Sequence, residues 1–136
     1  MKKLFLMLSL AFFAMNIANA QKVSESNEVF DSVDKTPEFP GGIPAMFEFI
    51  GHTLKYPSPA KRAKVQGKVF VKMIVEKDGS INDAAIVKGI GFGCDEEVIR
   101  VVKAMPKWTP GQKGDAIVRT SFTLPVNFVL DNKKSK

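Results

Sequence analysis

The stretch KVFVKMIVEKDGSINDAAIV, residues 68–87, decides the fold. Its first half alternates with a period of two, as a strand does when it buries one face. The apolar positions of that alternation are Val69, Val71, Met73 and Val75. Asp78 and Gly79 follow, a dipeptide that accepts the positive φ angles of a tight turn, and residues 81–87 return as a second strand. The sequence therefore predicts an antiparallel β-hairpin.

A helix is predicted on each side of this hairpin. Before it, apolar residues recur at helical spacing over 43–54, and Pro44 suits the first turn of such a helix. After it, a glycine-rich loop over 89–93 leads into a second amphipathic pattern over 94–105. Three acids lie in the first turn of this second helix, where the helix dipole favours negative charge, and Pro106 ends it.

Residues 116–130 predict one long final strand with a single buried face. Pro125 lies inside it and cannot donate a ladder hydrogen bond, and proline in strands is confined to edges, bulges and ends. We therefore place this strand, or at least its second half, on an edge of the sheet. The side chains expected on its exposed face are Ile117, Arg119, Ser121, Thr123, Pro125 and Asn127.

Together these elements predict an α+β domain over residues 43–131, a small antiparallel sheet of about three strands packed against two helices. The length of 136 residues suits one such domain, and a single cysteine excludes an internal disulfide. Residues 21–42 are expected to form a flexible polar leader that ends in a turn, in which Val29, Phe30 and Val33 could add a short strand or a hydrophobic staple. Residues 132–136 are expected to form a solvated basic tail.

Residues 1–20 carry the pattern of a secretory signal peptide. Lys2 and Lys3 precede an apolar run, and residues 18–20 are Ala-Asn-Ala, the small-x-small pattern of a cleavage site. At ~1.5 Å per residue the apolar segment falls short of a hydrocarbon core of ~30 Å, which favours cleavage over a retained anchor. The protein is therefore expected to be exported, without a membrane span once the signal is removed.

The sequence does not match the patterns typical of catalysis or cofactor binding. The glycines at 89–93 depart from the dinucleotide fingerprint, and the acids after them would repel a phosphate. His52 is the only histidine and lies near a helix end, where a lone histidine is more often a surface or capping residue than a base, while the acids beside Cys94 oppose a thiolate there. Basic and acidic residues are interleaved despite a formal net charge of +6, so nucleic acid is not an expected partner. We expect no enzymatic activity, no metal and no cofactor.

The sequence resembles the TonB carboxyl-terminal domain family over residues 52–130. A tyrosine-proline pair, a glycine before the first strand, the Asp-Gly turn and an aromatic-x-Pro-Gly segment occur in the order and spacing of that family. In this sequence these residues are Tyr56, Pro57, Gly67, Asp78, Gly79, Trp108, Pro110 and Gly111. The segment Phe39-Pro40-Gly41-Gly42, with the helix after it, resembles an extension common in the family's Bacteroidetes-type members.

The resemblance implies a function in the cell envelope. Members of the family add a short segment of an outer-membrane transport receptor to their sheet as a strand, and they transmit work from an inner-membrane complex. Here the accepting strand would be the last one, from Ala116 to Phe128. Arg119 is the side chain expected to meet an acidic group of the segment, in an exposed pair worth ~0.2–1 kcal/mol. The expected partner is an outer-membrane TonB-dependent receptor or another envelope protein, and a second copy could pair through the same strand.

Two roles stay open on the sequence alone. A transducer of the family has a membrane anchor and a long proline-rich linker that crosses the periplasm. This sequence has a signal that we expect to be cleaved and a short leader before the domain. A chain released from the membrane cannot transmit force, so the alternative is a structural or adaptor module of another envelope complex, without energy transduction.

The first prediction concerns export. N-terminal sequencing of the protein recovered from the producing cell should give Gln21 as the first residue, and the protein should fractionate with the periplasm. A product that begins at Met1 and remains in the inner-membrane fraction would contradict cleavage and restore the anchored transducer.

Overall fold

The computed structural model describes residues 22–130, so the expected signal peptide over 1–20 and the expected basic tail over 132–136 lie outside the described residues. Its elements along the chain are β1 (Lys22–Val23), β2 (Val29–Phe30), α1 (Gly42–Thr53), α2 (Ser58–Arg62), β3 (Gly67–Val75), β4 (Ile81–Lys88), α3 (Cys94–Lys103), β5 (Gly111–Lys113) and β6 (Ala116–Phe128). Both predicted helices, the predicted hairpin and the predicted final strand are present in the predicted order.

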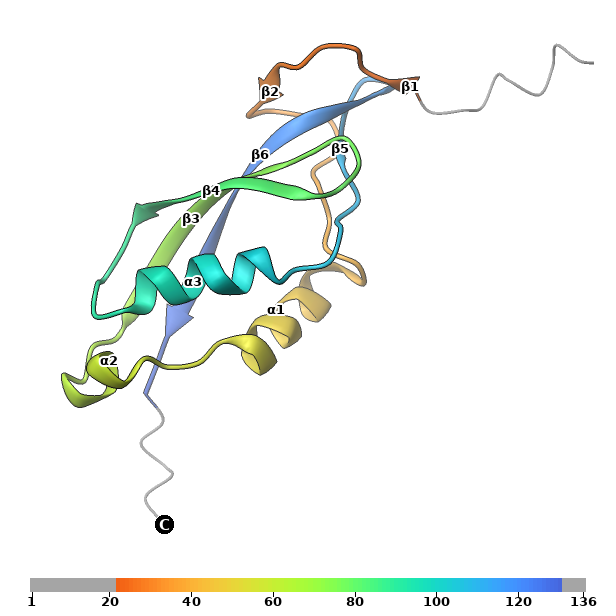
Figure 1. Cartoon of the computed structure of the whole chain (residues 1–136). Coiled ribbons are helices and arrows are strands. Elements are labelled where there is room, and N and C mark those ends of the chain that lie inside the picture. Colours follow the sequence, from red (N-terminus) through yellow and green to blue (C-terminus); the bar gives the residue numbers. More distant parts are fainter. Residues whose placement is uncertain (1–21, 131–136) are drawn as a thin grey trace, which may run out of the picture.

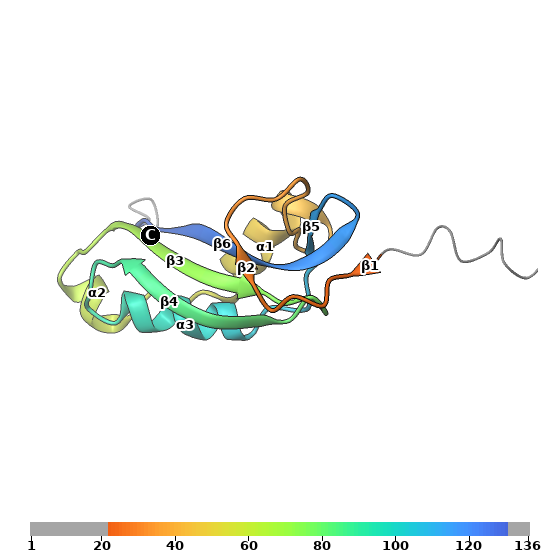
Figure 2. The ribbon, with the colours of Figure 1, turned by 90° about the horizontal axis from the view of Figure 1, so that it is seen from above.

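The elements form two layers, a sheet and a layer of helices on one of its faces (Figure 1). The sheet has the order β1-β6-β3-β4, and β2 and β5 also pair with β6. Figure 2 views the uncovered face, with α1 behind the β6 side and α3 behind the β4 side. The α+β class is confirmed, but six strands and three helices replace about three strands and two helices. The sheet is mixed rather than wholly antiparallel, because β1 and β2 pair with β6 in parallel. The additional elements have two to five residues each, too few to produce a periodic pattern in the sequence.

The core of the sheet is the antiparallel ladder between β3 and β6. It runs without a register shift from Gly67 opposite Phe128 to Val75 opposite Thr120. The alternation predicted for β3 is confirmed, because its four inward residues are fully buried. They pack with residues of β6, α1 and α3, among them Leu124, Val126, Phe128, Met46, Ile50, Val98, Val101 and Val102.

The Asp78–Gly79 turn packs against the loop that carries Trp108. Asp78 Oδ1 accepts hydrogen bonds from the amide and hydroxyl of Ser80 at 2.9 and 2.6 Å, and Gly79 has φ +89°. The Trp108 amide donates to the Gly79 carbonyl at 2.8 Å. A Cβ atom on Gly79 would lie 2.1 Å from the Trp108 carbonyl oxygen, so both the φ angle and the contact require glycine. The indole of Trp108 is buried and packs edge-on against Phe39 and Phe122.

The other residues of the family pattern also have structural positions. Tyr56 packs edge-on against Phe128 and donates its hydroxyl to the Val65 carbonyl. Pro57 precedes α2 in an extended conformation, and Gly67 begins β3. Pro110 precedes Gly111, which begins β5 at a close crossing: a Cβ atom there would lie 2.3 Å from Thr120 Oγ1. These residues therefore stabilise the turns and close contacts at which the secondary-structure elements meet.

The leader differs from the expected flexible segment over residues 21–42. β1 pairs with β6 in parallel, with Lys22 opposite Ala116, and β2 does the same, with Val29 opposite Arg119. Pro37 and Phe39 are then buried before α1 begins. The short strand at Val29–Phe30 is present as expected, whereas the strand at Lys22–Val23 was not expected. The unpaired side of β6 supplies backbone partners that no local sequence pattern reveals.

The second prediction concerns the turn and its glycine. Gly79→Ala should lower the free energy of unfolding by about 3 kcal/mol or more, since a left-handed alanine costs ~1–2 kcal/mol and the contact with Trp108 adds to it. Gly91→Ala is the matched control, because Gly91 also has positive φ (+75°) but has open space around it. Trp108→Ala should cost about 3–5 kcal/mol. Urea unfolding measures all three, and equal losses for the two glycine variants would refute the close contact.

Candidate partner-binding edge

The two long edges of the sheet differ in how well they could accept another strand. β4 forms one edge, and its pairing with β3 has two register shifts. Asp83 adopts φ +52° there, and Asn82 and Asp83 are exposed. Bulges and exposed charge are the usual means by which proteins prevent further pairing at an edge. β6 has no such shift along its ladder with β3 and is the better template.

Pro125 sets which backbone groups of β6 point away from the sheet. It lies opposite Phe70 and has no N–H, so this pair is one that exchanges no ladder hydrogen bonds. Hydrogen-bonded and non-bonded pairs alternate in an antiparallel ladder. The amides and carbonyls of Ser121, Thr123 and Asn127 therefore point away from β3. Ile117 is also an odd-numbered residue of β6, and its backbone likewise points away from the sheet. Its carbonyl accepts a hydrogen bond from the Ser24 amide on this outer side, at 2.9 Å.

The leader covers only the first half of this outer side. β1 and β2 pair with β6 at residues 116–117 and 119–120. Beyond Thr120, no strand among residues 22–130 pairs with the outer side of β6. We call this stretch, residues 121–127, the open edge. It offers three outward amides and four outward carbonyls, because Pro125 contributes only an acceptor.

The predicted binding residues share one face of β6, but only some of them remain accessible. Ile117 and Arg119 lie beside the leader, and the hydroxyl of Ser121 donates to the carboxylate of Asp31. Thr123, Pro125 and Asn127 are exposed on the uncovered face. The open edge is therefore shorter than the expected strand from Ala116 to Phe128.

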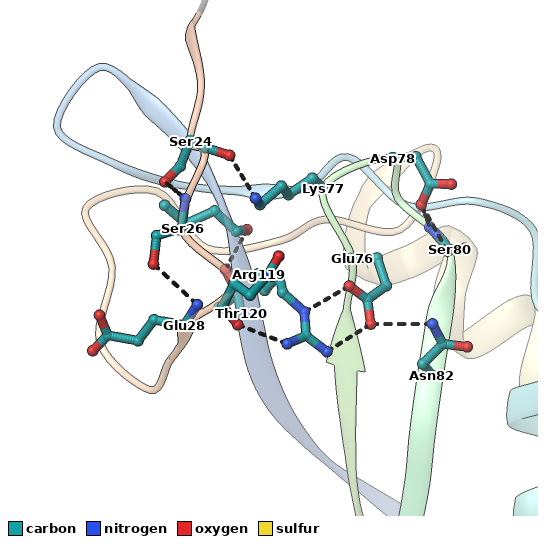
Figure 3. A network of polar contacts seen from close by, with 12 residues as sticks. Ser24, Ser26, Glu28, Glu76, Lys77, Asp78, Ser80, Asn82, Arg119 and Thr120 are labelled. Carbon is teal, nitrogen blue, oxygen red and sulfur yellow. Dashed lines mark hydrogen bonds and ion pairs between the residues drawn. The ribbon is translucent and has the colours of Figure 1, made fainter.

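Arg119 has a different role from the one expected. Its guanidinium binds Glu76 through two hydrogen bonds, from Nε at 2.8 Å and from Nη2 at 3.1 Å, and Nη1 donates to the Asn27 carbonyl at 2.7 Å (Figure 3). The two side chains of the ion pair are only 24% and 18% exposed. Arg119 therefore connects β6, the end of β3 and the leader, and is not free to meet a partner's acid.

The ion pair also changes the ionisation of its members. Hydrogen bonds from Arg119 hold the pKa of Glu76 below its usual value, with a further contribution from the amide of Asn82. The same contact raises the pKa of Arg119. The sequence alone does not reveal this ion pair, because its two residues are 43 positions apart and neither belongs to a recognisable motif.

Lysines of β3 border the open edge on the uncovered face. Lys72 lies opposite Thr123 and is half-exposed, with its Nζ 3.8 Å from a carboxylate oxygen of Asp31. Lys68 lies opposite Asn127 and is exposed. The ion pair between Lys72 and Asp31 is long and exposed to solvent, so it is weak. This region therefore presents positive charge beside outward backbone groups.

The groups considered for catalysis are not arranged for it. Cys94 is fully buried, and burial, with Asp95 and Glu96 nearby, raises the pKa of its thiol, which disfavours a nucleophilic thiolate. His52 is exposed in the last turn of α1. Within residues 22–130 no three or more metal-ligating side chains gather at one point. Over the same range no helix has the length and apolar character needed to cross a membrane.

A solved structure shows the class of this fold. The fold is similar to a solution structure of the TonB C-terminal domain from Helicobacter pylori, at 20% identity and a TM-score of 0.51, covering 66% of this chain and 95% of that one. A longer segment of the same protein also matches, at 20% identity and a TM-score of 0.47, covering 65% of this chain and 79% of that one. At this identity the likeness establishes the fold alone. No curated protein sequence matches the chain.

A family model described as the Gram-negative bacterial TonB protein C-terminal matches residues 52–130. The chain therefore belongs to the TonB C-terminal domain family, and the resemblance noted in the sequence is confirmed. The family is one of protein-interaction domains rather than of enzymes. The matched residues include β3, β4, α3, β5 and β6, and thus the whole open edge.

The third prediction tests the ion pair through acid. Glu76→Gln should lower the free energy of unfolding at neutral pH by about 1 kcal/mol. This is the upper end of what exposed ion pairs contribute, as expected for a pair with two good hydrogen bonds. The pKa of Glu76 is lower in the folded chain than its ordinary value of 4.5, so its contribution is complete above 4.5 and disappears as pH falls through the folded value. The difference between wild type and variant should therefore shrink below pH 4.5.

Urea unfolding over a series of acidic pH values measures this difference. Arg119→Gln and the double variant complete the thermodynamic cycle, and the double variant should be little less stable than either single one. A difference that stays constant with pH, or effects that simply add, would show that the pair contributes nothing.

Proposed function

We propose that the chain is an exported, periplasmic protein-binding module that captures an extended segment of an outer-membrane transport receptor on the open edge. One observation carries this proposal: the chain already adds two of its own strands to the outer side of β6 and stops at Thr120. The strand is thus able to accept partners on that side, and its next seven residues have none among the described residues. Family membership supports the same kind of partner.

Backbone pairing would supply most of the affinity. Each hydrogen bond formed with an outward group contributes about 0.5–1.5 kcal/mol net, against the loss of freedom on association. At ~3.3 Å per residue the open edge is about 23 Å long and suits a segment of about seven residues. The carbonyl of the segment nearest Pro125 would find no donor and would stay hydrated.

Lysines replace Arg119 as the proposed partners of acidic groups. A strand added to the open edge would place every second side chain on the uncovered face, one strand away from Lys72 and Lys68. Their long side chains can extend over β6 toward that strand. Such exposed pairs are worth ~0.2–1 kcal/mol each, so they would favour acidic segments without determining binding.

The alternative is an adaptor module that binds an envelope protein without energy transduction. It is favoured by the docking of the leader, in which Lys22–Val23 and Val29–Phe30 lie directly on β6. A pull applied through residue 22 would first separate these short strands, each held by only a few backbone hydrogen bonds. The first residue of the exported chain distinguishes the two roles.

The fourth prediction tests strand capture. Addition of peptides from receptor plugs to the exported protein should shift the amide resonances of residues 121–127 more than those elsewhere. Thr123→Pro removes an outward amide and should weaken binding at least about tenfold, which is 1.4 kcal/mol. Thr123→Val is the matched control, because it removes the hydroxyl but keeps the amide, and should bind within about twofold of wild type.

Circular dichroism and urea unfolding of both variants establish that they remain folded. Resonance shifts confined to α1 and the Tyr56–Pro57 region, or equal affinities for the Pro and Val variants, would contradict strand capture.

A further inference from the structure

A cavity of about 360 Å³ lies between the start of α1, the segment before it, Trp108 and Phe122. Its lining is mostly apolar, and it consists of Thr36, Pro37, Glu38, Phe39, Gly42, Ile43, Pro44, Met46, Trp108 and Phe122. Ile43, at the start of α1, is 66% exposed, so this part of the lining presents apolar surface to solvent. Predominantly apolar concavities of this size are typical of binding sites.

Phe122 connects this cavity to the open edge. It lies on β6 between Ser121 and Thr123, with its side chain on the helix-covered face. The residues of β6 that follow on the same face, Leu124, Val126 and Phe128, are buried, whereas Phe122 is only half-buried. The helix-covered layer is therefore less complete at Phe122 than along the residues of β6 that follow it.

Strand geometry determines what an added segment would place there. Side chains directly opposite each other on neighbouring strands lie on the same face, about 5 Å apart. The residue of a captured segment opposite Phe122 would therefore project onto the helix-covered face beside the Phe122 ring. Its neighbours in the segment would project onto the uncovered face, where Lys72 lies.

We propose that this cavity receives one large apolar side chain of the captured segment. The inference rests on the proposed function and deepens it by naming the partner's chemistry. The partner is an extended segment with a leucine-sized or larger apolar residue opposite Phe122 and at least one acidic residue on the alternate face. Phe122 both lines the cavity and belongs to the open edge, and the lysines supply the complementary charge. The outward backbone groups would give affinity, and the cavity would give the choice of segment.

Peptides that differ at a single position test this proposal on the exported protein. The probes are acetylated receptor-plug peptides of about seven residues that contain one acidic residue. At each position in turn, one peptide carries Leu and its matched partner carries Ala, with the rest of the peptide unchanged. At one position the Leu peptide should bind about tenfold to a hundredfold more tightly than the Ala peptide, as expected for burial of a side chain of that size. The ring resonances of Phe122 should shift with the Leu peptide.

A protein variant connects that preference to the cavity. Ile43→Asn makes the mouth of the cavity polar at an exposed position and should reduce the preference for Leu over Ala to about twofold or less. Phe47→Asn is the matched control, because Phe47 is a large apolar residue of α1 that is 53% exposed but does not line the cavity. It should leave the preference unchanged.

The outcomes separate the two proposals. The resonances of residues 121–127 could shift while the Leu and Ala peptides bind with equal affinity at every position. That result would overturn the cavity proposal and leave strand capture intact. An unchanged preference in Ile43→Asn would do the same. A preference for Leu without shifts along residues 121–127, or no binding at all, would overturn both.

Discussion

The nine-residue ladder between β3 and β6 is the interaction on which the rest of the structure depends. Pro125 determines which residue pairs of this ladder exchange hydrogen bonds and which do not. A proline can lie only opposite a residue with which it exchanges no hydrogen bond, so the Phe70–Pro125 pair fixes the alternation along the whole strand. The inward residues of β6 then contact α1 and α3, and the outward backbone groups of the odd-numbered residues point away from the sheet. The leader and the open edge use the same set of outward groups.

The sequence predicted the parts of the fold that depend on local patterns. The hairpin from residue 68 to 87, the two main helices and the final strand were all identified, because period and turn chemistry are properties of short segments. The edge placement of the second half of β6 followed from Pro125 alone, whereas the first half pairs with the leader. What the sequence could not reveal was pairing between distant short segments, such as Val29–Phe30 with Arg119–Thr120.

The binding role of β6 stays a prediction, but the structure shows where its residues lie and what Arg119 contacts. The exposed face of β6 was identified correctly, but Arg119 binds Glu76 and the leader rather than remaining accessible. Its partner could not be chosen from sequence, because many acids are available and the selection depends on the ladder register. The cavity beside Phe122 was missed for a similar reason: its walls come from the leader, α1, the Trp108 loop and β6, and the Phe and Met pattern of α1 predicted only core packing.

Native-state amide hydrogen exchange of the isolated chain tests the central claim most directly. If β6 has an open edge beyond Thr120, the amides of Phe122, Leu124 and Val126 should be strongly protected by the ladder with β3, while those of Ser121, Thr123 and Asn127 exchange orders of magnitude faster. Uniform protection from Ser121 to Asn127 in a monomeric sample would contradict the account, because it would mean that the outward groups of β6 already have partners.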